Sequence, residues 1–368
     1  MSILLKRGKS AKYGKSKIQI IKSGQARGWF DFDFSERHYV DESFVIDERK
    51  LERGDLLINS TGVGTAGRVT YFGEDGDFVV DSHITIFRPN QDLILPKYAL
   101  CALGLIGFDN IENMALGQSG QIELSLDIIG NIKIPVPPID VQKQIVEEIG
   151  KIEKSNNDAK SLIDKNLSDI RIIINGLGST VSIEEYFDIN TLTLNPTSCW
   201  KDEFFTYVDI DSVGKGDGSI SFDKKILGKD APSRARRVAE DRTVIVSTVR
   251  PYLKGFAYID SVPEKTIFST GFALLKSKNE ENYISKLLYY LFMFSDNLMK
   301  QMETAMPKAA YPSINKEDID NFKIPLLTID EQKRIVAQIE ALELEITKAR
   351  TFIENAASEK QAILDKYL

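Results

Sequence analysis

The chain contains very few of the residues from which metal centres and disulfide scaffolds are built. Cysteine occurs twice, at Cys101 and Cys199, and histidine twice, at His38 and His83, in 368 residues. Zinc ribbons, zinc fingers and disulfide-rich folds need more ligands at closer spacing, so these classes are excluded. Two cysteines without an obvious partner fit a reducing compartment, and we expect a cytoplasmic protein that holds no metal.

Long apolar runs are also missing. The two best candidates, residues 98–108 and 283–294, fall well short of the about 20 residues that cross a bilayer. The apolar run at residues 3–5 is too short for the core of a signal peptide. We expect buried helices at the two longer runs and no interaction with a membrane.

No set of residues typical of a catalytic site is found. The chain has neither a G-x-x-x-x-G-K-[ST] phosphate loop nor an Asn-Pro-Pro-aromatic motif. Glu48 and Lys50 lack the upstream Pro-Asp of a nuclease site, which leaves a surface charge pair. Residues 62–67 spell G-x-G-x-x-G, but the strand-like segment RVTYF follows, where a dinucleotide site needs a helix. A glycine-rich loop between strands is favoured, and we predict a binding protein, not an enzyme, without a cofactor of its own.

The overall composition is that of a globular protein. Apolar residues make up 42% and charged residues 27% of the chain, which is ordinary, and the length suggests two or three domains. The net charge of −7 excludes a compact, uniformly basic nucleic-acid binder. It leaves room for local basic patches.

An internal repeat is the strongest feature of the sequence. Residues 131–149 read NIKIPVPPIDVQKQIVEEI and residues 321–339 read NFKIPLLTIDEQKRIVAQI, at a constant offset of 190. So many identities in one register indicate a duplication. In each copy an extended segment containing proline precedes a helical pattern, and Asp140 and Asp330 stand where an N-cap is expected.

Each repeat leads into one long helix with a heptad seam. Apolar positions recur in steps of three and four residues, interrupted by Asn156 and Asn166 in the first helix and by Lys360 in the second. About 36 residues at about 1.5 Å each give a helix of about 54 Å. Because a lone helix would leave its apolar stripe in water, we expect the two helices to pair antiparallel. The residues assigned to this helix-pair or partner interface are Ile145, Ile149, Ile152, Ile163, Ile170, Ile335, Ile339, Leu342, Ile346 and Ile353.

The remainder of the chain is rich in short β-branched and aromatic runs broken by Gly, Asn and Asp, which are typical of strands. Residues 54–72 echo residues 241–259, with Ser60-Thr61 over Ser247-Thr248, and residues 78–89 echo residues 267–278. The expected fold is α+β: two strand-rich domains separated by two long antiparallel coiled-coil helices, related by a pseudo-two-fold repeat. The expected boundaries are 1–138 for the first domain, 139–177 for the first helix, 178–328 for the second domain and 329–368 for the second helix.

Two similar modules held apart by stiff helices would read two similar features at a fixed distance, and duplex DNA is the natural partner. Half-sites one turn apart lie about 34–36 Å from each other, which a helix of about 54 Å can span. Basic residues gather within residues 1–30 and 224–254, where they could neutralise phosphates or reach base edges. The nominated DNA contacts are Lys6, Lys9, Lys12, Lys15, Arg27, Ser60, Thr61, Arg68, Arg234, Arg236, Arg237, Ser247, Thr248, Arg250, Tyr252 and Lys254. Weaker nominations are Gln118, Ser119, Lys308 and Tyr311.

Taken together, these segments resemble specificity subunits of type I restriction–modification systems. The resemblance rests on GDLLINSTGVGTAGRV, STVRPYLKGFAYI, FSTGFALLK and the two proline-to-helix repeats, and it extends over nearly the whole chain. It implies two target recognition domains that read the halves of a bipartite DNA site, with the helices setting the spacer. It also implies that the helices dock two modification subunits, which carry S-adenosylmethionine and methylate adenine at N6. Restriction subunits with ATP and magnesium would join that complex, and none of this chemistry would reside in the present chain.

The sequence departs from this family pattern at two places. The second domain begins with the lead-in VSIEEYFDIN, residues 181–190, whereas the first begins almost directly at KRGKSAKYGKS and is expected to lack the equivalent. The proline pattern also differs, because residues 136–138 read VPP and residues 326–328 read LLT.

Two alternatives are kept. One is a specificity subunit of a related bipartite system whose partner fuses methylase and nuclease. The other is a coiled-coil scaffold that never touches DNA, which an absence of salt-dependent duplex binding would favour.

Overall fold

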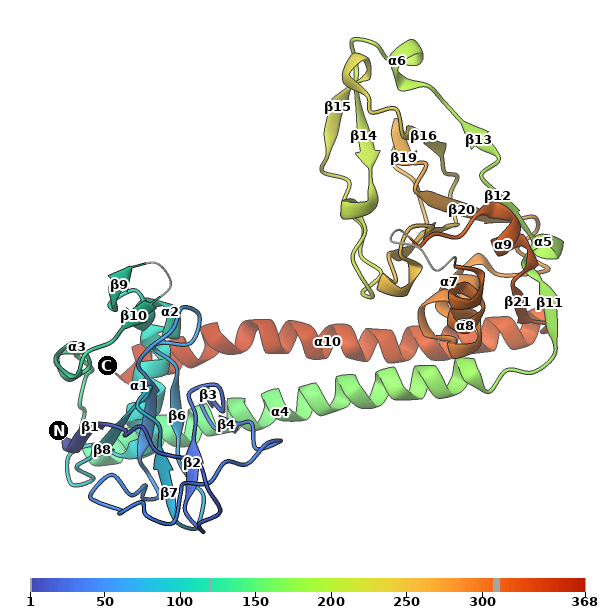
Figure 1. The fold of residues 1–368 in the computed structure, drawn as a ribbon. Helices are drawn as coiled ribbons and strands as arrows, with labels where there is room; N and C mark the ends of the chain where they lie inside the picture. Colours follow the sequence, from blue (N-terminus) through green and yellow to red (C-terminus); the bar gives the residue numbers. More distant parts are fainter. Residues whose placement is uncertain (1, 119–120, 307–311, 368) are drawn as a thin grey trace. The chain divides into compact units, whose positions relative to one another are not determined.

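The computed structural model describes residues 2–118, 121–306 and 312–367 (Figure 1). The chain divides into two compact units, residues 1–160 with 351–368 and residues 161–350. Two long helices, α4 (Ile139–Asn175) and α10 (Ile329–Tyr367), contribute to both units.

The first unit is built on a four-stranded antiparallel sheet. Its order is β1 (Ser2–Arg7), β8 (Ile84–Pro89), β5 (Leu56–Asn59) and β6 (Val69–Tyr71). Side chains alternate between the two faces, so Leu56 and Ile58 join one buried cluster and Leu57 joins another. Helix α1 (Pro96–Ile106) packs against β6 and β8.

Shorter elements complete the first unit. They are the parallel pair β2 (Gln19–Ile21) and β7 (Phe78–Val80), the pair β3 (Ala26–Gly28) and β4 (Asp31–Phe32), helix α2 (Phe108–Glu112), the hairpin β9 (Leu116–Gln118) and β10 (Gln121–Glu123), and helix α3 (Leu126–Gly130).

The second unit repeats this plan. Its four-stranded sheet has the order β12 (Phe187–Ile189), β20 (Phe272–Ser277), β17 (Thr243–Ser247) and β18 (Phe256–Ile259), and α7 (Ser285–Phe294) packs against β17, β18 and β20. A five-stranded sheet follows the order β13 (Leu192–Thr193), β16 (Ala235–Val238), β19 (Thr266–Ser269), β14 (Phe204–Val208) and β15 (Lys225–Leu227). The parallel pair β14–β19 corresponds to β2–β7 of the first unit.

The remaining elements of the second unit are small. They are the pair β11 (Thr180–Ser182) and β21 (Lys323–Pro325), helices α5 (Ile183–Tyr186), α6 (Pro196–Cys199), α8 (Asp296–Ala305) and α9 (Lys316–Asn321), and three 3-10 turns at Ile210–Ser212, Gly228–Asp230 and Pro251–Leu253.

The expected antiparallel pairing of the long helices is confirmed. In the first unit Glu148 of α4 accepts hydrogen bonds from Lys366 and Tyr367 at the end of α10, at 2.9 Å and 2.6 Å. In the second unit Asn166 of α4 donates to Glu345 of α10 at 2.8 Å. With 37 and 39 residues, the helices are about 56 Å and 58 Å long.

Two of the three polar residues predicted in the seam, Lys360 and Asn166, have partners where the helices meet, whereas the buried side-chain oxygen of Asn156 has no hydrogen-bond partner among the described residues. Lys360 is only 8% exposed, forms an ion pair with Glu153 of α4 and lies 4.7 Å from the centre of the Trp29 ring. Asn166 is buried, and its amide supplies the hydrogen bond to Glu345. Both side chains therefore bind partners at the seam.

Burial of the predicted seam isoleucines is uneven. Ile145 and Ile149 belong to the core of the first unit, and Ile170, Ile335, Ile339 and Ile346 belong to the core of the second. Ile163 and Leu342 pack against that second core, while Ile152 and Ile353 are half-buried. The start of each helix is thus part of its own domain's core.

The predicted N-caps are wrong by two residues. The helices start at Ile139 and Ile329, so Asp140 and Asp330 lie in the first turn. Thr328 precedes α10, and its backbone N–H and hydroxyl both donate to Glu331 at 2.8 Å. The aspartates still carry negative charge near a helix N-terminus, which is the end that favours it.

A buried glutamine ties each long helix to its own domain. The Gln142 amide accepts from the Leu95 N–H at 2.8 Å and donates to the carbonyls of Leu93 and Pro137 at 2.9 Å and 2.8 Å. Gln332, its counterpart at the offset of 190, repeats the arrangement. It accepts from the Ile284 N–H at 2.9 Å and donates to the carbonyls of Asn282 and Leu327 at 2.9 Å and 3.1 Å. We call these two residues the glutamine clamps.

Candidate nucleic-acid interface

Two loops and the end of β10 converge at the end of β5 in the first unit, and we call residues 60–68, 81–83 and 121–124 the first loop cluster. The Ser60 N–H donates to the His83 carbonyl, and the Leu124 N–H donates to the Ser60 carbonyl, both at 2.8 Å. The Thr61 hydroxyl lies 2.7 Å from Nδ1 of the exposed His83. Backbone bonds therefore fix the cluster and leave polar side chains at its surface.

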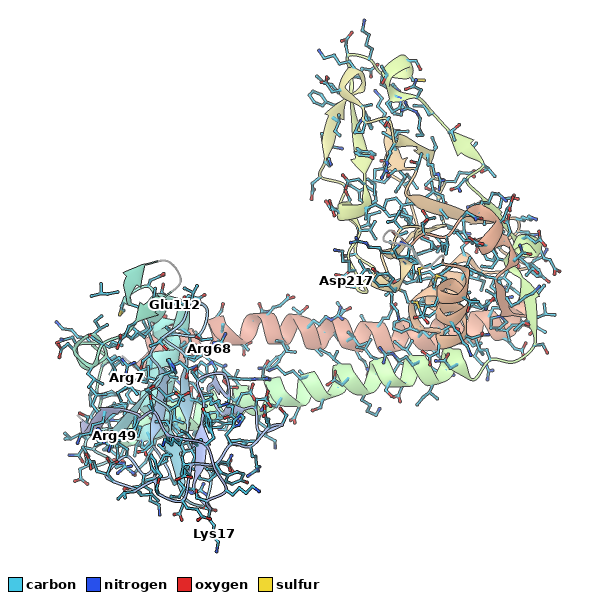
Figure 2. All side chains as sticks on the ribbon, viewed as in Figure 1. Arg7, Lys17, Arg49, Arg68, Glu112 and Asp217 are labelled. Carbon is cyan, nitrogen blue, oxygen red and sulfur yellow. The ribbon has the colours of Figure 1, made fainter. Side chains whose placement is uncertain are left out.

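The glycine-rich segment forms the longest loop of this cluster. It joins β5 to its antiparallel neighbour β6, so the predicted loop between strands is confirmed and no helix follows it. The Gly64 N–H donates to Glu112 at 2.8 Å, and Arg68 donates to the Gly64 carbonyl at 2.5 Å (Figure 2). Gly67 has a φ of +84°, and an added Cβ would lie 2.5 Å from the Phe108 carbonyl oxygen. A side chain at that position is excluded.

The second unit contains the matching arrangement at the end of β17. We call residues 248–255, 269–271 and 312–314 the second loop cluster. The Thr248 N–H donates to the Gly271 carbonyl, and the Ile314 N–H donates to the Thr248 carbonyl, both at 2.9 Å. These two bonds are the counterparts of those that Ser60 makes with His83 and Leu124.

This hydrogen bonding corrects the alignment expected from the sequence. Ser60 corresponds to Thr248, and Asn59 corresponds to Ser247, because Asn59 pairs with Ile84 as Ser247 pairs with Phe272. The two loops differ by one residue in length. The sequence comparison aligned residues 54–72 with residues 241–259 without a gap, whereas the structure places a one-residue difference inside the loops, after Ser60 and Thr248.

Several nominated residues lie in the second loop cluster. The Arg250 N–H donates to the Pro312 carbonyl at 2.9 Å, and Arg250 and Lys254 both have positive φ angles, +47° and +53°. Tyr252 is 46% exposed between them. Arg234 joins the cluster because its carbonyl accepts from the Thr270 N–H at 2.9 Å.

Other nominated residues are turned inward. Ser60 and Ser247 are buried, and their hydroxyls bond to Thr85 at 2.7 Å and to the Val249 carbonyl at 2.9 Å. The half-exposed Thr248 donates its hydroxyl to the Gly271 carbonyl at 2.9 Å. These hydroxyls shape the loops rather than face outward.

Lys254, Arg236 and Arg237 are half-buried. Lys254 donates to the Met293 carbonyl at 2.7 Å, and burial together with the nearby Arg171 lowers its pKa. Arg236 donates to the Ala235 carbonyl at 2.7 Å. Burial lowers the pKa of Arg237, and one of its terminal nitrogens is buried without a hydrogen-bond partner among the described residues.

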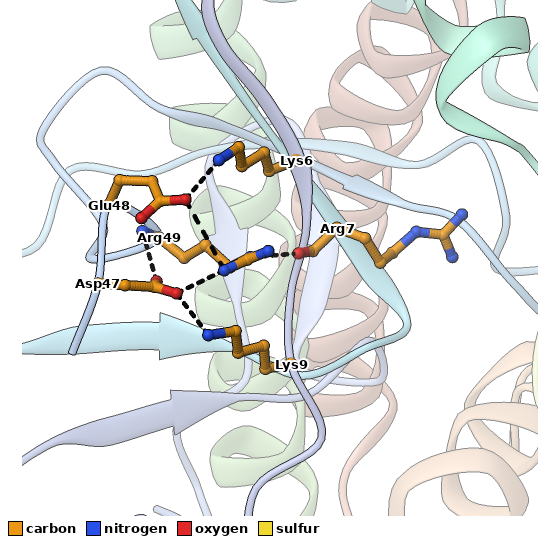
Figure 3. Close-up of polar contacts among 6 residues, drawn as sticks. All are labelled: Lys6, Arg7, Lys9, Asp47, Glu48 and Arg49. Carbon is orange, nitrogen blue, oxygen red and sulfur yellow. Dashed lines mark hydrogen bonds and ion pairs between the residues drawn. The ribbon is translucent and has the colours of Figure 1, made fainter. Parts of the chain in front are cut away.

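The N-terminal basic run does not form a single patch. Lys6 pairs with Glu48, and Lys9 pairs with Asp47 at 2.5 Å, which holds the pKa of Asp47 down at about 2 (Figure 3). Arg27 pairs with Asp33. Lys12 and Lys15 are exposed, and Figure 2 shows the neighbouring Lys17 well away from Arg68. The structure thus spreads these cations over the first unit, and only the segment around Lys9 adjoins the first loop cluster, because Ser10 donates to Ser82 at 3.0 Å.

Two residues at the first loop cluster were absent from the nominated contacts. His83 lies in an alternating sequence pattern that is compatible with packing or with a DNA contact, and the structure exposes it one residue before β8. Arg7 ends β1, outside the cluster. Its guanidinium donates to Glu123 at 3.0 Å and to the Leu124 carbonyl at 2.7 Å, which holds the third segment of the cluster in place.

The four weaker nominations have no described side-chain position. Ser119, Lys308 and Tyr311 lie outside the described residues, as does the side chain of Gln118.

Within the described ranges, no group of three or more potential metal ligands is found. No helix in the same ranges has the length and apolar character that crossing a membrane requires.

The fold and the paired loop clusters define a class of protein: a two-domain nucleic-acid recognition subunit with a helix pair. The family described as "Type I restriction modification DNA specificity domain" matches residues 6–167 and again residues 180–354. The chain therefore belongs to this family. It is the DNA specificity subunit of a type I restriction–modification system, the non-catalytic component that recognises DNA. The alternative of a scaffold that never touches DNA is set aside.

Curated relatives span the whole chain. The putative type I restriction enzyme MjaX specificity subunit of Methanocaldococcus jannaschii is 25% identical over 99% of this chain and 90% of the relative. The type I restriction enzyme MjaVIII specificity subunit of the same organism is 26% identical over 98% and 90%.

Solved structures share the fold. The type I restriction–modification S subunit from M. genitalium has a TM-score of 0.57 at 14% identity and covers 99% of this chain and 93% of its own. A chain from a study of complex assembly and conformational transition in the type I system has a TM-score of 0.55 at 17% identity, covering 99% and 97%. The expected α+β architecture is confirmed.

Proposed function

We propose that the chain reads a bipartite duplex site in the cytoplasm, with one loop cluster at each half-site. The observation that carries this proposal is the repetition of the same backbone hydrogen bonds, Ser60 with His83 and Leu124 in one unit and Thr248 with Gly271 and Ile314 in the other. A frame built twice, with different side chains on each copy, suits the reading of two different half-sequences.

The side chains for base reading are those at the cluster surfaces. In the first unit these are Thr61, Arg68 and His83, and in the second they are Arg234, Arg250 and Tyr252. Arginine can bond bidentately to guanine, and hydroxyl groups can reach either base type. Lys12 and Lys15 are better suited to phosphates, because they are exposed on a different part of the first unit.

The helix pair is the proposed docking site for two modification subunits. Ile172 of α4 is 67% exposed and Leu344 of α10 is 56% exposed, although both lie on helices with buried seams. Exposed apolar side chains on such helices favour a covering partner. In this proposal S-adenosylmethionine and adenine N6 methylation belong to the modification subunits, and ATP and magnesium belong to restriction subunits.

The domain boundaries 1–138, 139–177, 178–328 and 329–368 are retained as part of the proposal. Under this division each recognition domain ends just before the helix that its glutamine clamp holds. The two helices would set the gap between half-sites.

Mapping of methylated adenines tests the proposal. Cells lacking other modification systems would express the chain with its cognate modification subunit, and their genomic DNA would be sequenced for N6-methyladenine. We expect a two-part motif with a fixed gap. Thr61→Ala with Arg68→Ala should relax only one half of that motif, and Arg234→Ala with Arg250→Ala only the other.

Removing each base-reading side chain should reduce discrimination at its position by about 1–3 kcal/mol. A matched control is Lys201→Ala with Lys229→Ala, which removes two positive charges from the second unit away from its loop cluster and should leave both half-motifs unchanged. If both pairs of cluster variants altered the same half, or neither altered any position, the assignment of one cluster to each half-site would be wrong.

A further inference from the structure

A cavity of about 390 Å³ lies in the second unit, where the loop after β17 meets the two long helices. Three of its lining residues carry positive charge: Lys254 of that loop, Arg171 of α4 and Arg350 of α10. Apolar side chains, among them Met293 and Phe294 of α7, form much of the remaining wall. The cavity therefore joins the second loop cluster to both helices.

The three cations are not neutralised by acids beside them. Among the described residues, none of the three forms an ion pair. The Lys254 ammonium donates instead to the uncharged Met293 carbonyl at 2.7 Å. Burial and the charge of Arg171 lower the pKa of Lys254, and Asp296 opposes them. Like charges that share one cavity without counter-charges favour the binding of an anion.

Two acids line the same cavity, and each already has hydrogen-bond donors of its own. Asp217, labelled in Figure 2, accepts from the backbone N–H and the hydroxyl of Ser219 at 2.9 Å and 2.8 Å. Glu343 accepts from Tyr290 at 2.6 Å, and burial raises its pKa. Three cations thus share the cavity with two carboxylates that are partly occupied, which leaves a surplus of positive charge.

A tyrosine adds an uncharged donor to the cavity. Tyr289 is only 9% exposed, and its hydroxyl has no hydrogen-bond partner among the described residues. Gly218 packs against this hydroxyl, because its φ is +72° and an added Cβ would lie 2.0 Å from the hydroxyl oxygen. Burial raises the pKa of Tyr289, so the hydroxyl keeps its proton. It is therefore available to donate to a ligand oxygen.

The first unit does not share this surplus of charge. Strand pairing equates Lys254 with Gly67, and both have positive φ angles, +53° and +84°. The offset of 190 equates Glu343 with Glu153, which forms an ion pair with Lys360. The second unit thus has a lysine in a backbone conformation that favours glycine, and the first has a neutralised carboxylate. The duplication alone does not explain the cationic cavity.

Duplex DNA is the anion that this surface is placed to meet. The chain recognises DNA, and Lys254 belongs to the second loop cluster, where Arg250 and Tyr252 are the proposed base readers. The Gly216 N–H donates to the Lys254 carbonyl at 2.9 Å, which fastens another wall of the cavity to this cluster. The cavity is therefore continuous with the proposed reading surface, and backbone phosphates flank every base that is read.

We propose that this cavity binds a phosphate group of the DNA backbone beside the half-site read by the second loop cluster. Arg171, Lys254 and Arg350 supply the positive charge, and the Tyr289 hydroxyl donates a hydrogen bond. The proposal rests on the assignment of that cluster to a half-site, and it adds that the long helices themselves contact DNA. Because phosphate contacts fix the position of a protein on the duplex, the helices would set the register of the second domain on its half-site.

Uncharged phosphate analogues test the proposal directly. The full chain, assembled with its cognate modification subunits, is mixed with duplexes in which single phosphates are replaced by methylphosphonate. The duplexes carry the motif found by methylation mapping, whether or not it has two parts. At one or two adjacent positions, replacement should weaken binding by the wild type about tenfold at about 0.1 M salt, and binding by Arg171→Gln, Arg350→Gln less than about twofold. If no position distinguishes the two proteins, the proposal is wrong.

The salt dependence of binding provides a second measurement. In Arg171→Gln, Arg350→Gln the slope of log affinity against log salt should fall by about 0.9, the value for one phosphate, on specific and nonspecific duplexes alike. Arg171→Lys, Arg350→Lys should retain the wild-type slope, because it keeps both charges. The matched control Lys201→Gln, Lys229→Gln removes the same charge from the second unit outside the cavity. An equal fall in the control would contradict the proposal.

A free phosphorylated molecule is the other source of the same chemistry. ATP and inorganic phosphate are each added at millimolar concentration to the assembled complex without DNA, and thermal melting is followed. We expect the wild type and Arg171→Gln, Arg350→Gln to respond alike. Stabilisation confined to the wild type would show that a free anion fills the cavity, and would overturn its assignment to DNA.

Failure of this proposal is distinguishable from failure of the proposed function. The variant Arg171→Gln, Arg350→Gln should leave both halves of the methylated motif unchanged, since phosphate contacts specify no bases. A change of bases in the motif would mean that these arginines read sequence, and would contradict the proposal. A bipartite motif without any phosphate that distinguishes the two proteins would refute the cavity alone and leave the loop clusters as readers.

Discussion

At the scale of single residues, a basic side chain is available to DNA only to the extent that an acid does not already neutralise it. Lys6 and Lys9 lie beside Glu48 and Asp47, and Arg49 joins the same group (Figure 3). The pKa of Asp47 is about 2, so its carboxylate stays charged at any working pH. Lys6 and Lys9 therefore neutralise DNA phosphates less than two unpaired lysines would.

Removing the two acids should release the lysines. The double variant Asp47→Asn, Glu48→Gln should bind duplex DNA more tightly at low salt. Its plot of log affinity against log salt should steepen by about 1 to 2, because each neutralised phosphate contributes about 0.9. The control Glu74→Gln, Asp92→Asn makes the same change in net charge elsewhere in the first unit. Equal slopes for the two variants would show that Lys6 and Lys9 do not approach phosphates.

A buried carboxyl makes the second unit sensitive to pH. Glu343 of α10 accepts a hydrogen bond from Tyr290 of α7 at 2.6 Å, with Lys286, Glu340 and Arg350 nearby. Burial raises the pKa of Glu343 above its ordinary value of 4.5. The folded state thus holds this proton more tightly than the unfolded state. The contribution of Glu343 to stability is greatest below its ordinary pKa and falls as the pH rises through its raised, folded-state pKa.

Glu343→Gln should remove that dependence while keeping an acceptor for Tyr290. Urea unfolding at several pH values between 4 and 8 would measure it, and the variant should lose less stability over this range than the wild type. Glu354→Gln on the same helix is the control, because that residue is exposed and is not among the charges that act on Glu343. Parallel curves for Glu343→Gln and the wild type would refute the assignment.

At the scale of elements, the glutamine clamps join helix to domain. Each clamp satisfies one backbone N–H and two carbonyls that neither the sheet nor the helix supplies with partners. A buried polar group left without a partner costs about 1–3 kcal/mol. Loss of one clamp side chain should therefore lower the free energy of unfolding by more than the loss of one ordinary hydrogen bond.

Gln142→Ala should destabilise the first unit by about 2–4 kcal/mol, since it leaves three backbone groups without their partner. Gln332→Ala should do the same to the second. Gln144, two residues along α4, is exposed, and Gln144→Ala should cost less than about 0.5 kcal/mol. Chemical denaturation of the three variants provides the measurement, and a cost for Gln142→Ala as small as that for Gln144→Ala would contradict the role of the clamp.

The elements show how far the sequence could be interpreted. The long helices were predicted to within a residue or two, because heptad periodicity and a gap-free repeat are local signals. The pairing of Lys9 with Asp47 could not be predicted, because it joins residues 38 positions apart through the fold. The correspondence of Ser60 with Thr248 was missed because the first loop is one residue longer than the second. Nothing in the composition of the two segments marks where that extra residue lies. The repeated glutamine was visible, but its partners lie nearly 50 residues away.

At the scale of the whole molecule, the length of the helix pair is proposed to set the number of base pairs between the two half-sites. Residues 153 and 360 face each other, as do residues 166 and 345, so the same level can be identified on both helices. Deleting one heptad at one level from both, residues 156–162 and 350–356, keeps the seam in register. It removes about 10.5 Å of rise, which corresponds to about three base pairs at about 3.4 Å each.

Expressed with its cognate modification subunit, the shortened protein should direct methylation to a motif with the same two halves and a gap smaller by about three base pairs. Modification mapping, as for the loop variants, would detect the change. Deleting residues 156–162 alone should abolish activity instead, because the seams of α4 and α10 would no longer match. An unchanged gap in the double deletion would mean that the helices do not set it.

The glutamine clamps also bear on how such proteins diversify. The segments that surround them, residues 131–149 and 321–339, are closely similar, and each glutamine makes the same two bonds to the backbone ahead of α1 or α7 and a third within its own segment. A genetic crossover inside either segment would join a new recognition domain to an old helix without disturbing the attachment. New combinations of half-sites could therefore arise by cassette exchange, with no need to redesign the joint.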